Sequence, residues 1–229
     1  MARLRRLIDL GIETCAALRN AFGGRRGSRP RAVADRDGLR AFLETRASYV
    51  AQMSLYGYLR TRAGVRFPEL FDDDPFVVSI NIAKWHIWLA CLSDLSVYAG
   101  FLMLHRTKVS ADEVGKLMRA VLDDALAVAG TPDDAGPEFA SHADRVRARL
   151  ALCDWPTIAD NEFAFVESPD ALVQWAPIVD DLKQLDADVV RNSVRFRWQE
   201  VRRDLRRDLL ADAVLAEASA GVADAIAVP

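Results

Sequence analysis

The stretch AKWHIWLACLSDLSVYAGFLMLHR, residues 83–106, is the most apolar part of the chain, yet it carries side chains suited to chemistry. Asp94 lies near its middle, and a buried carboxylate either finds a partner or takes up a proton. Tyr98, one helical turn later, can donate a hydrogen bond to it. An arginine from another helix, Arg60 or Arg62, is the better charged partner. One candidate polar pocket follows, with five side chains: Tyr56, Tyr58, His86, Asp94 and Tyr98.

A serine hydrolase needs a nucleophile and a base within hydrogen-bond reach, and this stretch does not supply such a pair. His86 and Ser93 share a helix face, but seven residues at 1.5 Å separate them by about 10.5 Å. The chain also lacks a G-x-S-x-G motif. We interpret the small residues Ser93, Ser96 and Gly100 as a face that a neighbouring helix approaches closely.

Metal and cofactor sites have weak support in the sequence. Glu138 and His142 stand at i and i+4, but no second pair completes a ligand set. The acidic run at residues 72–74 suits a helix start, and both glycine-rich phosphate-loop motifs are absent. Three widely spaced cysteines indicate free thiols in a reducing compartment. We therefore expect no metal, no cofactor and a cytoplasmic protein.

Positive charge is concentrated at the start of the chain. Residues 1–31 carry eight arginines against Asp9 and Glu13, a balance of +6, and the whole chain carries −3, so the remainder carries −9. Apolar side chains in residues 1–22 recur with the helical period and form one stripe. Such a helix suits an anionic membrane surface or a partner protein. The predicted binding residues are Arg3, Leu4, Arg5, Arg6, Leu7, Ile8, Ile12, Leu18, Phe22, Arg25 and Arg26.

Four segments follow from composition and periodicity. Residues 1–22 are the basic amphipathic helix, and the Gly/Arg/Pro-rich residues 23–34 form a flexible linker. Residues 35–215 form a helical domain, and residues 216–229 form an Ala-rich tail. Because no convincing period-2 run occurs, we predict an all-α, multi-helix bundle of about six to seven helices.

Several helix starts can be read directly. An Asp cap opens a helix over residues 35–64, and Asp74-Pro75 opens one that runs to residue 106. Ser110 and Glu113 form a predicted capping box for a helix ending near Ala129. A further helix covers residues 138–153. The motif Ser168-Pro169 predicts a cap followed by the first helical position.

The last long helix, predicted from Val179 to Ala218, carries two apolar stripes about 150° apart. One stripe contains Leu182, Leu185, Val189 and Phe196, and the other contains Val194, Trp198, Val201, Leu205 and Leu209. Either the helix bends around residues 192–193 or it contacts two different neighbours.

Residues 85–104 are long enough to span a membrane. Eight strongly apolar residues each favour insertion by about 0.3–0.6 kcal/mol, but Asp94 costs about 2.5–3.5 kcal/mol at mid-depth. Because the other helices are amphipathic and need partners, we favour a core helix.

The sequence favours a cytoplasmic adaptor or interaction protein without catalysis, attached on the inner face of the plasma membrane or to a partner through residues 1–22. Two alternatives stay open. One is a helical-bundle enzyme, a hydrolase included, or a small-molecule-binding protein with a pocket around Asp94. The other is nucleic-acid binding through the Arg-rich residues 191–207, where Glu200, Asp204 and Asp208 instead favour a face of intrahelical ion pairs.

Overall fold

The computed structural model describes residues 32–161 and 164–226, and within them it contains seven α-helices and no strand. This confirms the predicted all-α, multi-helix bundle. The elements in chain order are α2 (Arg36–Ala63), the 3-10 helix η1 (Gly64–Asp72), α3 (Asp74–Arg106), α4 (Ala111–Ala129), α5 (Phe139–Ala151), the 3-10 helix η2 (Trp155–Thr157), α6 (Glu167–Trp175), α7 (Asp180–Asp208) and α8 (Ala211–Ile226).

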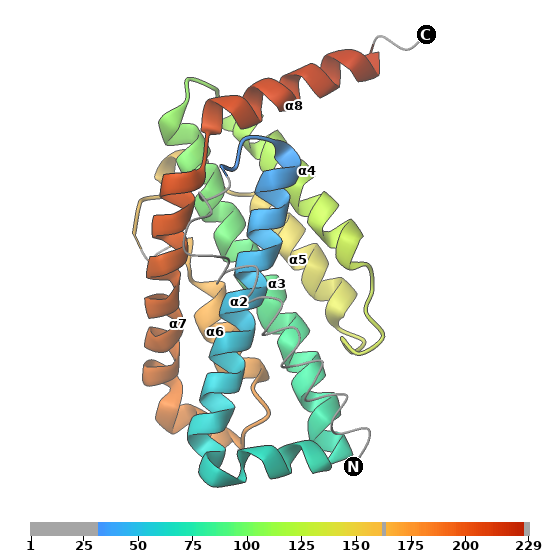
Figure 1. Ribbon diagram of the computed structural model, residues 1–229, viewed down its shortest axis with the longest axis vertical. Coiled ribbons are helices and arrows are strands. Elements are labelled where there is room, and N and C mark those ends of the chain that lie inside the picture. Colours follow the sequence, from blue (N-terminus) through green and yellow to red (C-terminus); the bar gives the residue numbers. More distant parts are fainter. Residues whose placement is uncertain (1–31, 162–163, 227–229) are drawn as a thin grey trace.

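Helix α3 is the central element of the bundle and packs against α2, α4, α5 and α6 (Figure 1). Among the described residues it is the one helix long and apolar enough to span a membrane, and 94% of its most apolar window is buried inside the fold. The neighbouring helices thus cover the side chains that gave residues 85–104 their high hydropathy. In this structure α3 is a core helix, as the sequence favoured.

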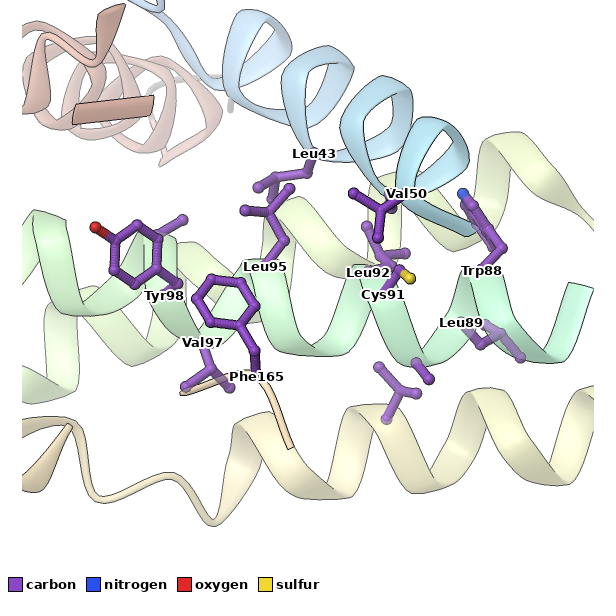
Figure 2. Close-up of a cluster of buried hydrophobic side chains, with 14 of the residues drawn as sticks. Leu43, Val50, Trp88, Leu89, Cys91, Leu92, Leu95, Val97, Tyr98 and Phe165 are labelled. Carbon is purple, nitrogen blue, oxygen red and sulfur yellow. The ribbon is translucent and has the colours of Figure 1, made fainter. Parts of the chain in front are cut away.

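One part of the hydrophobic core lies between α2 and α3 (Figure 2). Leu43 and Val50 of α2 face Leu92 and Leu95 of α3. Phe165, from the segment before α6, packs against Tyr98 and Trp198. These side chains are almost wholly removed from solvent. Burying each one contributes roughly 1.5–3 kcal/mol relative to leaving it exposed.

Two of the predicted helix caps are confirmed. The Asp35 side chain accepts a hydrogen bond from the Gly38 N–H and starts α2. Ser110 and Glu113 form the reciprocal capping box at the start of α4. Each arrangement satisfies backbone N–H groups that the first helical turn leaves without partners.

The predicted continuous helix from Val179 to Ala218 is wrong. Helix α7 runs without interruption through residues 192–193 and ends at Asp208, after which α8 starts a new direction and projects from the end of the bundle (Figure 1). The break has a backbone cause. The Val33 N–H donates to the Asp208 carbonyl at 2.8 Å, and the Leu210 N–H donates to the Val33 carbonyl at 2.9 Å. These bonds hold Leu209 in an extended conformation.

The predicted helix over residues 1–22 and the linker residues 23–31 lie outside the described part of the chain. The last residues of the predicted linker are described, and there Val33 is buried beside Leu209. The chain is therefore anchored to the bundle from Val33 onward. The predicted Ala-rich tail overlaps α8, whose described part extends to Ile226.

Candidate functional site

Asp94 is fully buried, and both of its carboxylate oxygens are occupied. Oδ1 accepts hydrogen bonds from the Arg149 guanidinium at 2.7 Å and the Glu167 N–H at 3.1 Å. Oδ2 accepts from the Ser168 N–H at 2.8 Å and the Ser168 hydroxyl at 2.6 Å. Two donors on each oxygen use the hydrogen-bonding capacity of the carboxylate. Asp94 therefore caps the first turn of α6 from a neighbouring helix.

Arg149 of α5 links this carboxylate to its surroundings. Its guanidinium also donates to the Ser93 hydroxyl at 2.9 Å and the Ala164 carbonyl at 3.1 Å, and lies 3.0 Å from the Glu167 carboxylate. Burial raises the pKa of Asp94, while the Arg149 charge and the Ser168 hydrogen bonds oppose that rise. The arrangement is a buried ion pair with its donors and acceptors satisfied.

The expected partners of Asp94 are wrong. Arg62 instead pairs with Asp186 of α7, and Tyr98 donates to Asp160 at 2.9 Å. The sequence did not predict Arg149 as the partner of Asp94. The available signal was its position three residues after the buried Val146, at the edge of the apolar stripe of α5. The predicted cap at Ser168 is also wrong, because α6 begins at Glu167 and its acceptor comes from Asp94.

The five residues of the predicted polar pocket have separate surroundings. Tyr58 donates to Asp186 at 2.9 Å, and burial, together with Asp186, raises its pKa to about 12. Tyr56 is half-buried against the core. His86 stacks on Trp175, with ring centroids 3.6 Å apart. Tyr58, His86 and Tyr98 thus have hydrogen-bond partners other than Asp94 in the described part of the chain.

His86 and His142 form a second polar pair inside the fold. Their Nδ1 atoms lie 2.8 Å apart, so one ring donates and the other accepts. Burial, together with the neighbouring His86 and Arg145, lowers the pKa of His142 to about 4. Burial also lowers the pKa of His86. Within the described ranges no group of three or more metal-ligating side chains is present.

At Gly100 the small-residue face of α3 receives a side chain. The indole of Trp155 lies on Gly100, where a methyl group would overlap the ring. Ser93, on the same face, accepts its hydrogen bond from Arg149. The face therefore makes room for one large aromatic ring and one guanidinium.

Helix α7 has one buried and one exposed apolar stripe. Val194, Trp198, Val201 and Leu205 are buried, together with Leu209 just beyond the helix end. On the other side Leu185, Val189 and Phe196 are 76%, 74% and 71% exposed. We call these three residues the α7 outer stripe. Beside it an open groove of about 330 Å³ is lined by Tyr49, Phe196, Arg197, Gln199, Glu200 and Arg203.

The arginines of α7 are largely engaged in ion pairs within the protein. Arg202 and Arg206 both bind Asp160 at 2.8 Å, and Arg207 binds Asp204 and Asp208. Burial alone would raise the pKa of Asp160, but hydrogen bonds from Arg202, Tyr98 and Arg206 lower it to about 2. Much of the positive charge in residues 191–207 is therefore neutralised locally.

No protein-family model, curated protein or solved structure matches this chain. The predicted membrane- or partner-binding residues, from Arg3 to Arg26, all lie outside the described ranges.

Proposed function

We propose that this chain is an interaction protein attached to an anionic membrane surface by its basic N-terminal segment, residues 1–31. The observation that carries the proposal is the division of charge, +6 in these residues against −9 in the rest. Each arginine near an anionic surface contributes about 1 kcal/mol, and the apolar stripe of residues 4–22 adds insertion of its side chains. The acidic bundle is repelled by the same surface, so binding is oriented.

Two features of the bundle support an interaction role over catalysis. The most conspicuous buried acid, Asp94, has four donors on two oxygens and no lone pair left for a substrate. The outer stripe of α7 exposes three large apolar side chains on one face, a pattern typical of contact surfaces. The ion pairs of Arg202, Arg206 and Arg207 reduce the support for nucleic-acid binding.

Vesicle pelleting of the full chain tests the proposal. We expect binding to vesicles containing phosphatidylglycerol, weaker binding as salt increases, and no binding to phosphatidylcholine alone. The variant R25E/R26E should lose most of this binding. A matched control, R60E/R66E, makes the same charge change at exposed positions of α2 and η1 and should bind almost as wild type. Equal pelleting of both variants, insensitive to salt, would remove the membrane role.

A further inference from the structure

No element among the described residues covers the outer stripe of α7. The sequence of this helix contains one other apolar stripe, which includes Val194 and Trp198. That other stripe packs into the core. Three large apolar side chains on one face of a long helix indicate that a further element packs there. The sequence of residues 4–22 also contains an apolar stripe that requires a surface to pack against.

We propose that residues 4–22 of the same chain dock on the outer stripe of α7. This docking does not require that the protein binds membranes. Displacement of the docked segment by a membrane does, and that part rests on the proposed function. The occupant is the chain's own segment, and three observations support it: reach, spacing and charge.

The first observation is reach. The described chain starts beside the C-terminal end of α7, where Val33 bonds to Asp208 and Leu210. From Leu209 back to Phe196 is about 20 Å along the helix. Residues 23–32 can extend over about 33 Å, so Phe22 reaches Phe196 with length to spare. A short tether also gives an effective concentration in the millimolar range, which favours the same chain over a second copy.

The second observation is spacing. Cys15 and Phe22 are seven residues apart on the stripe of the N-terminal segment, and Val189 and Phe196 are seven residues apart on α7. Two parallel helices with Phe22 beside Phe196 therefore place Cys15 beside Val189. The groove next to Phe196, with Tyr49 on its wall, is the place for the Phe22 ring.

The third observation is charge. Asp181 and Asp188 lie at the edges of the outer stripe, both exposed, and Asp188 has only a long 3.5 Å contact to Arg191. In the register that pairs Phe22 with Phe196, Arg5 of the N-terminal segment lies near Asp181. Opposite charges at the rim of an apolar contact set its orientation and speed its formation.

The docked arrangement covers the same side chains that membrane insertion needs. An anionic membrane therefore competes with α7 for residues 4–22, and the protein alternates between a closed form and a membrane-bound form. Weakening the outer stripe with L185D/V189D removes one competitor. If half of the molecules or more are closed, the variant should bind phosphatidylglycerol vesicles at least about twofold more tightly than wild type.

Disulfide trapping in the full chain tests the docking. In a Cys153→Ser background, Val189→Cys is expected to form an intramolecular disulfide with native Cys15, because Cys91 is fully buried. Val128→Cys is the matched control, a 67% exposed valine on α4. We expect the Val189→Cys disulfide to form at least about tenfold faster, from the higher effective concentration. Equal rates, or disulfide-linked dimers in place of the closed monomer, would overturn intramolecular docking.

The two proposals fail separately in these experiments. Trapping without vesicle binding keeps the docking and removes the membrane role. Vesicle binding without trapping removes the docking and keeps the membrane role. Trapping that slows when phosphatidylglycerol vesicles are added supports both.

Discussion

The carboxylate of Asp94 accepts hydrogen bonds from both the backbone N–H and the hydroxyl of Ser168, at 2.8 and 2.6 Å. A side chain of α3 thus supplies the N-terminal cap of α6, a helix that starts more than seventy residues later. The same carboxylate pairs with Arg149 of α5 at 2.7 Å. One buried acid therefore fixes three helices relative to one another.

Asp94→Ala should lower the free energy of unfolding by about 3 kcal/mol, because it takes a fully buried acceptor from Arg149, which keeps Glu167, and leaves the first N–H groups of α6 without partners. Urea denaturation at pH 7 measures the change. Asp170→Ala is the control, since Asp170 pairs with Arg191 on the surface and its loss should cost less than about 1 kcal/mol. Equal effects of the two substitutions would contradict the structural role of Asp94.

Gly100→Ala should destabilise the protein by about 1–3 kcal/mol, because the added methyl group would overlap the Trp155 ring. Gly57→Ala in α2 is the matched control. A Cβ there meets only the Arg197 guanidinium at ordinary contact distance, so the gain in helix propensity should stabilise by about 0.5–1 kcal/mol. Thermal unfolding distinguishes the opposite signs, and a stabilising Gly100→Ala would disprove the packing.

The pair His86–His142 predicts loss of stability in mild acid. His142 has a folded-state pKa of about 4, below its ordinary value of roughly 6.5, so the unfolded chain binds a proton at a pH where the folded chain does not. The contribution of His142 to the free energy of unfolding is therefore fully present above about pH 6.5 and is lost as the pH falls to about 4. Because His142 is partly exposed, solvent screening reduces the effect to about 1 kcal/mol.

Denaturant titrations at pH 7 and pH 4.5 measure this loss. His142→Phe keeps a stacked ring without a titrating nitrogen, and its stability should fall less between the two pH values than that of the wild type. His105→Phe, at the exposed end of α3, should keep the wild-type difference. A His142→Phe variant with the full wild-type loss would show that another group is responsible.

The two stripes of α7 predict opposite responses to the same substitution. Val194→Ala removes a buried side chain and should cost about 1–3 kcal/mol. Val189→Ala removes an exposed one, so its effect on the stability of the bundle should stay within about 0.5 kcal/mol. Even with residues 4–22 docked, Val189→Ala should lower the free energy of unfolding by less than Val194→Ala does. A larger loss at Val189 than at Val194 would reverse the assignment of the faces.

The helices were predictable because their signals are local. The capping box at Ser110 and the Asp cap at Asp35 lie within four residues of the groups they satisfy. The two stripes of α7 were likewise visible as a change in the 3.6-residue period. Which stripe faces the core depends on where α2 and α6 lie, and that information is not local.

What the sequence by itself determined is the class of fold, the central position of α3 and the division of charge between its first 31 residues and the rest. Only the tertiary structure decided that Asp94 meets Arg149 and Ser168, that Trp155 fills the space above Gly100, and that Val33 ends α7 at Asp208. Periodicity and capping act over one or two helical turns. Partners that lie 55 or more residues apart are chosen by the packing of whole helices, since a buried polar group accepts whichever donor the bundle brings to it.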